Sequence, residues 1–277
     1  MRISTLAGVL IAAVIMGPAI AAPPPPVWTW TGFYIGANAG YSWGNDHGPI
    51  TLGNSFSAEQ NTSLDGFIGG GQLGYNWQTN NWVYGLETDF QGTGQKGSAN
   101  AVCPGGPSLT SVNGVCTPGH VGDTVPNSNP AFPVNANLSE KLEWLGTFRG
   151  RIGTTITPTL LPYLTGGLAY GHIKATEAAS TTNVFGTTGV NNGTFAPGGG
   201  SFSNGTTKVG WTIGAGIESM LWGNWTGKIE YLYVDLGTVS GSFPTTIVSL
   251  SGGSLVAGYS SHVTDNIVRV GVNYAFH

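Results

Sequence analysis

The sequence predicts an all-β fold built from long antiparallel strands, and three observations support this prediction. Eight segments alternate apolar residues with glycine, hydroxyl or charged residues, which is the period of two that strands show. Charged residues make up 8% of the 277-residue chain, against about a quarter in a soluble domain. No internal segment reaches the about 18 consecutive apolar residues of a membrane helix. The composition leaves two classes, a membrane β-barrel and a glycine-rich secreted β-protein.

The N-terminal residues are typical of an export signal followed by a spacer. Residues 1–21 combine a positively charged start, an apolar core and a small-residue cleavage site at Ala19 and Ala21. Residues 22–31 form a proline-rich lead-in, and residues 32–277 form the predicted β-barrel domain. The formal net charge of −4 provides no basic surface for a nucleic acid.

Each predicted strand is defined by its apolar face. In chain order the strands are 32–43, 65–77, 82–91, 141–153, 163–173, 208–221, 225–235 and 263–276. Their apolar faces begin, in the same order, at Phe33, Phe67, Trp82, Leu142, Leu164, Val209, Trp225 and Val268. The pattern is clearest in the sixth strand, where Val209 and Trp211 alternate with Gly210 and Thr212. These segments exceed the about 5–6 residues usual in soluble proteins and match the about 9–11 of a membrane strand.

The connections between these strands alternate in length. Those after the second and sixth strands are tight turns, the latter at Gly223-Asn224, and the fourth strand is also followed by a short connection. Those after the first, third, fifth and seventh strands are long. Short turns at one end and long loops at the other are typical of outer-membrane barrels, whose short turns face the periplasm. We therefore predict an eight-stranded antiparallel up-and-down transmembrane β-barrel with long extracellular loops.

Side-chain volume decides which face of this barrel looks outward. About eighteen aromatic rings lie on the apolar face, and an eight-stranded barrel has interior room only for modest side chains. The apolar face must therefore look into lipid. The distance from Phe33 to Trp43 projects to roughly 26 Å at a tilt of about 40°, close to the about 25 Å band between two aromatic girdles. The predicted girdle residues are Phe33, Trp43, Trp77, Trp82, Trp144, Trp211, Trp225, Tyr233, Tyr274 and Phe276.

The inward face then holds most of the charge, with equal numbers of acidic and basic residues. The predicted network comprises Glu87, Asp89, Lys141, Glu143, Arg149, Arg151, Lys208, Glu218, Lys228, Glu230, Asp265 and Arg269. Opposite charges in a narrow interior should pair, because an unpaired buried charge is costly. We predict that they form a plug that closes the barrel; the alternative is a selectivity lining for a small pore.

Other chemistry has little support in the sequence. Cys103 and Cys116 lie in one loop of an exported chain, which predicts a disulfide. The GxGxxG pattern at 69–74 lies within a strand and lacks the following helix of a nucleotide site, and the histidines lack the spacing of a metal site. His172 with Glu177 is the one candidate catalytic pair, and no Ser-His-acid arrangement accompanies it. We therefore predict no catalytic residues, cofactor or metal.

Five segments of the predicted strands resemble those of a known family. The segments that carry the resemblance are WTGFYIGANAGYSWG, GFIGGGQLGYNWQTNNWVYGLETDF, LPYLTGGLAYG, WTGKIEYLYVDLG and VRVGVNYAF. Together they are similar to the RopB-type outer-membrane proteins, eight-stranded barrels related to OmpA and OmpX and often described as a porin family. One departure is that His277 follows the aromatic Phe276, on which these barrels usually end.

The resemblance implies an integral protein of the Gram-negative outer membrane, exported by a Sec-type route. Its implied partners are outer-membrane lipid and lipopolysaccharide, and the barrel-assembly machinery, which acts on the C-terminal strand. Loops 92–139 and 174–206 are where we expect contact with a host or envelope surface ligand, since recognition usually resides in loops on a rigid scaffold. Three functions remain: a structural and surface-contact barrel, a small pore, and an enzyme that modifies envelope lipid.

Overall fold

The computed structural model describes residues 28–52, 56–103, 115–116, 134–181, 198–248 and 254–276. The predicted signal peptide, most of the lead-in and His277 lie outside the described residues. A search of the described residues for an apolar helix long enough to cross a membrane finds none.

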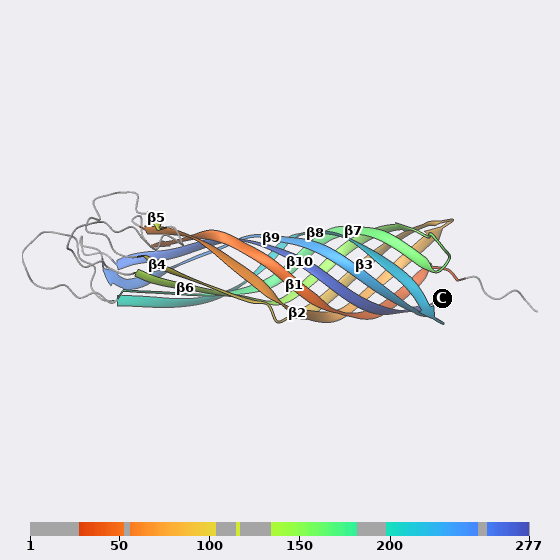
Figure 1. The fold of residues 1–277 in the computed structure, drawn as a ribbon, viewed down its shortest axis with the longest axis horizontal. Coiled ribbons are helices and arrows are strands. Elements are labelled where there is room, and N and C mark those ends of the chain that lie inside the picture. The colour runs from red at the N-terminus through yellow and green to blue at the C-terminus, as the bar shows by residue number, and fades with distance from the viewer. Residues whose placement is uncertain are drawn as a thin grey trace, which may run out of the picture.

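The fold is a closed ring of antiparallel strands. The strands are β1 (Gly32–Leu52), β2 (Phe56–Thr79), β3 (Trp82–Thr93), β4 (Lys96–Cys103), β5 (Val115–Cys116), β6 (Val134–Thr154), β7 (Leu160–Thr181), β8 (Gly198–Trp222), β9 (Trp225–Val248) and β10 (Ser254–Phe276). Eight of them, β1, β2, β3, β6, β7, β8, β9 and β10, pair in turn, and β10 closes on β1 with Phe276 opposite Phe33. Figure 1 shows these strands winding around a common axis. The predicted eight-stranded up-and-down barrel is confirmed.

The short turns lie together at one end of this barrel. β2 turns into β3 through Asn80, and β8 turns into β9 through Gly223, whose φ values are 53° and 52°. The Gly223 position explains the predicted Gly-Asn turn, because glycine adopts positive φ without steric cost. β1 begins and β10 ends at this short-turn end, and the long strand extensions lie at the other (Figure 1).

The strands are much longer than predicted, so the prediction of long loops is partly wrong. β8 has 25 residues and β7 has 22, and their ladder continues to the pair Thr181–Gly198. Much of the predicted loops 92–139 and 174–206 is therefore strand. Gly, Ser and Thr give these extensions little apolar contrast, but backbone hydrogen bonds between antiparallel strands do not require it.

Above the barrel, the ring divides into two facing sheets. In the described residues, pairing between β8 and β9 ends at Trp211–Asp235, and β2 pairs with β4 only at Asp65–Lys96. One sheet is then β4, β6, β7 and β8, and the other is β2, β1, β10 and β9, with β5 parallel to β2. We call this two-sheet region the extension.

Two bulges mark the boundary between barrel and extension. On β6 the register shifts between Leu142 and Trp144, and on β9 it shifts beside Gly237, whose φ is 71°. An extra residue in one strand moves every following side chain to the opposite face. Leu142 is therefore buried in the interior, and its predicted position on the lipid face is wrong.

Candidate functional site

The outer face of the barrel carries the aromatic side chains that the sequence predicts to face lipid. Phe67 is 78% exposed and Phe33 60%. At the short-turn end, the ring of Tyr274 lies 5.2 Å from that of Trp225 and 5.1 Å from that of Phe276. The residues of the predicted girdles, all of which lie on this outer face, are Phe33, Trp43, Trp77, Trp82, Trp144, Trp211, Trp225, Tyr233, Tyr274 and Phe276.

Arg149 of β6 lies at the centre of a charged interior. Its guanidinium donates to Glu230 of β9 at 3.1 Å and to Asp89 of β3 at 2.9 Å, and it also contacts Glu87. Arg269 of β10 donates to Glu230 and to Asp89, each at 2.7 Å. All five side chains are buried. The strands thus bring together groups that are up to 180 residues apart in the chain.

Two further cations complete this network toward the short-turn end. The Nζ of Lys228 lies 2.9 Å from both carboxylate oxygens of Glu87. Arg151 donates to Glu218 at 2.6 Å. The plug, as we use the term, comprises Glu87, Asp89, Arg149, Arg151, Glu218, Lys228, Glu230 and Arg269. It contains four basic and four acidic side chains, so it is formally neutral.

Two tyrosines that the sequence analysis missed donate hydrogen bonds to the plug. Tyr34 donates to Glu87 at 2.8 Å and Tyr163 donates to Glu230 at 2.9 Å. The guanidinium of Arg151 lies 4.1 Å from the Tyr163 ring centroid, a cation–π distance. The signal was present in the alternation, because both residues lie on the inward-facing parity of their strands.

Four residues of the predicted network lie outside the plug. Lys141 and Glu143 flank the β6 bulge on the outer side and pair with each other at 3.6 Å. Lys208 is half-buried on the inward parity of β8, with no ion pair in the described part of the chain. Asp265 is buried, but it accepts hydrogen bonds from Ser42 and Gln95 rather than from a cation. The bulge explains the first two errors, because it reverses the face on which Lys141 lies.

Two small cavities lie in the interior of the barrel. One cavity beside Tyr34 and Asn76 and another beside Leu64 and Asp265 have volumes of about 10 Å³ each, room for no more than about one water. Above the plug, the interior is apolar; its buried residues are Leu64, Ile68, Leu138, Leu142, Leu145, Ala169, Ile173, Ala175, Leu232, Val234, Leu236, Val239, Tyr259, Val263 and Ile267. Charged side chains and apolar side chains thus occupy successive levels of the interior.

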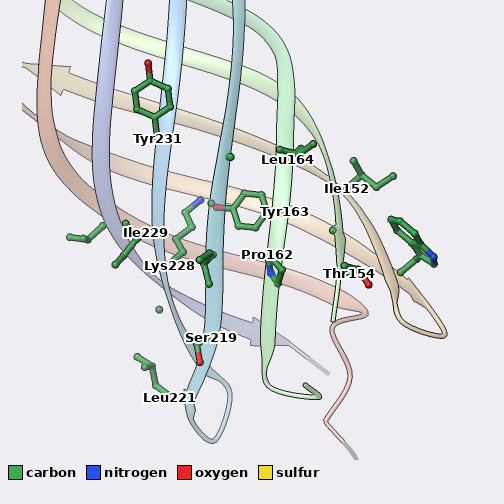
Figure 2. Close-up of a pocket in the computed structure, with 17 residues that line it drawn as sticks. Ile152, Thr154, Pro162, Tyr163, Leu164, Ser219, Leu221, Lys228, Ile229 and Tyr231 are labelled. Carbon is green, nitrogen blue, oxygen red and sulfur yellow. The ribbon is translucent and has the colours of Figure 1, made fainter. Parts of the chain in front are cut away.

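A large hollow of about 1090 Å³ lies on the outer face of the barrel. Figure 2 shows Ile152, Leu164 and Ile229 among its lining residues, whereas Lys228 and Tyr163 appear on the inner side of the strands. Those three apolar side chains are 42% to 63% exposed. The hollow is therefore part of the surface that faces hydrocarbon, and its apolar lining suits acyl chains.

The extension holds a second group of buried ionisable side chains. Asp46, Glu140 and Glu177 are at most 2% exposed, and their carboxylate oxygens have no hydrogen-bond partner. Burial raises the pKa of Asp46 and of Glu177 to about 7. Burial, followed by the nearby Glu177 and Asp46, raises the pKa of Tyr259. The sequence analysis missed this group, because the segments that carry it lack apolar contrast and were predicted as loops.

The candidate catalytic pair does not assemble. His172 lies on the outer face, stacked on Trp144 at 6.0 Å between ring centroids, whereas Glu177 points into the extension. Among the described residues, no three His, Cys, Asp or Glu side chains are grouped as metal ligands. Cys103 ends β4 and Cys116 ends β5; the predicted disulfide rests on side chains outside the described residues.

Comparison with known proteins now assigns the family. A family model described as "Outer membrane protein beta-barrel domain" matches residues 10–276. The chain belongs to the outer-membrane β-barrel family. It is similar to the 31 kDa outer-membrane immunogenic protein of Brucella melitensis biotype 1 (38% identity; 92% of this chain and 87% of that protein). It also resembles the 22 kDa outer membrane protein of Rhizobium leguminosarum bv. viciae (27% identity; 92% and 82%).

Among solved structures, Neisserial surface protein A aligns with this outer-membrane protein at a TM-score of 0.33 and 12% identity, covering 89% of this chain and 98% of that chain. The predicted outer-membrane localisation is confirmed by the family and its relatives. Since the short turns of such barrels face the periplasm, the short-turn end is periplasmic and the extension is extracellular.

Proposed function

We propose that this outer-membrane barrel has a structural and surface-contact role in the Gram-negative envelope, with a lumen closed by the plug. The observation that carries the proposal is the neutral set of four basic and four acidic side chains, all at most 5% exposed. Removing one partner would leave an uncompensated buried charge, which costs several kcal/mol. Paired charges of this kind hold strands together and leave no aqueous path beside them.

The competing function is a small pore, and planar-bilayer conductance separates the two. Protein refolded in detergent, and shown by a heat-modifiability gel to be folded, would be inserted into a planar bilayer. A closed lumen gives no steady single-channel openings. Reproducible openings of one conductance, abolished when the protein is omitted, would refute the closed lumen and support the pore.

An enzyme acting on envelope lipid is the third function considered. The relatives' names describe outer-membrane immunogenic proteins, and His172 and Glu177 lie on opposite faces of β7. Mass spectra of lipid A from cells with and without the protein test this function. The proposal expects identical spectra, and a protein-dependent change in mass would contradict it.

The surface-contact role is assigned to the extension. Its outward side chains are small and polar: Thr176, Ser201, Ser203 and Ser240 are all exposed. Because the two sheets pack through the buried apolar cluster, the extension presents these groups on a rigid scaffold rather than on free loops. Cells that produce a variant lacking 174–206 should keep the barrel in the membrane and lose contact with host or envelope surfaces; unchanged contact would contradict this role.

Assembly depends on the last strand. Phe276 ends β10, is 53% exposed, and pairs with Phe33 of β1 at the point where the barrel closes. We infer that the barrel-assembly machinery engages this strand before closure. Phe276→Ala should lower the amount of heat-modifiable protein in outer membranes, whereas Phe33→Ala, on the partner strand, should lower it much less. Equal losses would contradict a special role of β10.

A further inference from the structure

Three lysines stand side by side on the outer face of the extension. Lys96 of β4 is paired with Lys141 of β6, and Lys141 is paired with Lys174 of β7. All three occupy outward-facing positions of their strands, and each is exposed or half-exposed. Directly opposite residues in antiparallel strands have Cβ atoms about 4.5–5.5 Å apart. The register therefore builds a row of three positive charges, which we call the lysine row.

Repulsion between the three positive charges of the lysine row destabilises this part of the sheet. Like charges directly opposite each other across antiparallel strands are destabilising, and in the described residues Lys96 and Lys174 have no ion pair. The acidic groups near the row are Glu143, which lies 3.6 Å from Lys141, and Asp65, which is paired in register with Lys96 and accepts a hydrogen bond from Tyr41. A net positive row remains that an external anion would stabilise.

The lysine row accounts for nearly all the cations outside the plug. The chain has 9 Lys and Arg residues: Arg2 in the predicted signal peptide, four in the plug, the three of the row, and Lys208. The opposite side of the extension, formed by residues 44–52, 236–248 and 254–264, contains no Lys or Arg. Within the extension, the lysines of the row therefore lie on one side only.

The row lies directly above the outer edge of the lipid-facing surface. Two residues below Lys174, His172 stacks on Trp144, whose ring lies 5.4 Å from that of Phe90. Two residues correspond to about 7 Å along a strand. Phe90 is 54% exposed toward lipid. An apolar aromatic surface thus ends where a row of cations begins, which matches a lipid whose acyl chains lie below an anionic headgroup.

We propose that the lysine row binds the phosphate groups of lipid A in the outer leaflet, with the acyl chains against the aromatic surface beneath. Basic side chains at a membrane surface recognise anionic headgroups by charge, and lysine binds phosphate as a point charge. The site selects a lipid that carries more than one phosphate on a broad headgroup, because three lysines on three adjacent strands span more than one phosphate. It rests on the outer-membrane location and is independent of whether the lumen conducts.

Binding of purified lipid A to the refolded protein in detergent, followed by native mass spectrometry, tests the proposal. Each lysine near an anionic lipid surface contributes about a fivefold change in affinity, so K96Q/K141Q/K174Q should bind bisphosphorylated lipid A about a hundredfold more weakly. K208Q, which removes a lysine outside the row, is the matched control and should bind as the wild type does. E143Q should bind more tightly, because it removes the acidic neighbour of Lys141.

Comparison ligands identify what the row recognises. Lipid A without its phosphates should bind the wild type as weakly as bisphosphorylated lipid A binds the triple variant, and millimolar inorganic phosphate should compete little. Unchanged binding by the triple variant, an equal loss in K208Q, or equally tight binding of phosphatidylglycerol would each overturn the proposal. A heat-modifiability gel on every variant ensures that lost binding is not lost folding.

Discussion

The lower and upper halves of this molecule are made from the same strands but have opposite polarity. In the lower half, Phe67 and Leu164 point outward while Arg149 and Glu230 fill the interior. In the upper half, polar residues such as Thr176 point outward, and hydrocarbon fills the interior. Each half turns outward what its surroundings tolerate, lipid below and water above. The comparison teaches that strand alternation sets two faces, and the solvent decides which is inside.

The bulges are where the two halves meet. On β6 the shift at Leu142–Trp144 keeps Leu138 and Leu142 inside above it and Arg149 inside below it. Without the extra residue, an unbroken alternation would point the upper apolar residues into water. One inserted residue therefore allows a single strand to present apolar side chains to lipid below the bulge and polar side chains to water above it.

The largest effect is expected where the lower interior loses a charge. Arg149→Met leaves Glu87, Asp89 and Glu230 without their central cation, and breaking a buried pair costs about 3–5 kcal/mol. The free energy of unfolding in urea, followed by heat-modifiability, should fall by that amount. Lys141→Gln, which removes the exposed pair with Glu143, should change it by less than about 1 kcal/mol. Equal effects of the two substitutions would show that the plug is not buried.

The upper interior should respond as an ordinary hydrophobic core. Leu138 is buried above the β6 bulge, and Leu138→Ala should lower the free energy of unfolding by about 3 kcal/mol, through lost burial and the cavity that remains. Leu168→Ala, at a lipid-facing position 55% exposed, leaves no cavity and should cost less than about 1 kcal/mol. If Leu168→Ala proved the more costly, the assignment of inside and outside on these strands would be wrong.

The buried carboxyls of the upper half should make its stability depend on pH. The pKa of Asp46 and of Glu177 is about 7 in the folded protein, against about 4 in an unfolded chain. The folded state therefore holds more protons between these values, and stability falls as pH rises from about 4 to about 7. At about 1.4 kcal/mol for each pKa unit, two such groups give an expected loss of several kcal/mol across this window.

Amide hydrogen exchange in the extension at pH 4.5 and pH 7.5 measures this change. The protection factors of β1 and β7 above the membrane, which correct for the base-catalysed rise of intrinsic exchange with pH, should fall at the higher pH, and Asp46→Asn combined with Glu177→Gln should remove most of that fall. The lower half serves as an internal control, since its carboxylates are paired with cations. Identical protection factors of the extension at both pH values would contradict the assignment.

The smallest effect is expected at the β9 bulge. Gly237 has φ of 71° with open space around its Cα, so a side chain there meets backbone strain and no steric clash. Gly237→Ala should cost about 1 kcal/mol. Gly92→Ala, at a position with equal space and no positive φ, should be neutral. An unchanged free energy of unfolding in Gly237→Ala would mean that the bulge does not require this backbone conformation.

Much of the fold and part of the site could be predicted from the sequence. The aromatic alternation located the barrel strands, and nine of the twelve charged residues predicted for the other face are buried in the interior. The β6 bulge could not be predicted, because one inserted residue changes no composition; Lys141, Glu143 and Leu142 were misplaced as a result. The extension was missed because its Gly, Ser and Thr residues show weak contrast, although Leu138 and Val239 are buried in it.

The measurement that tests the central claim most directly is a nitroxide scan of β6 from 138 to 152, in protein with both native cysteines replaced by serine. The structure predicts that a nitroxide at position 148 collides with oxygen dissolved in the lipid, and that a nitroxide at position 147 is protected from oxygen. Above the bulge the alternation of exposed and protected positions reverses. A nitroxide at position 141 should contact water, and one at position 142 should be protected. An unbroken alternation through Glu143, or lipid contact at Thr147, would contradict a barrel that is charged within the membrane and apolar above it.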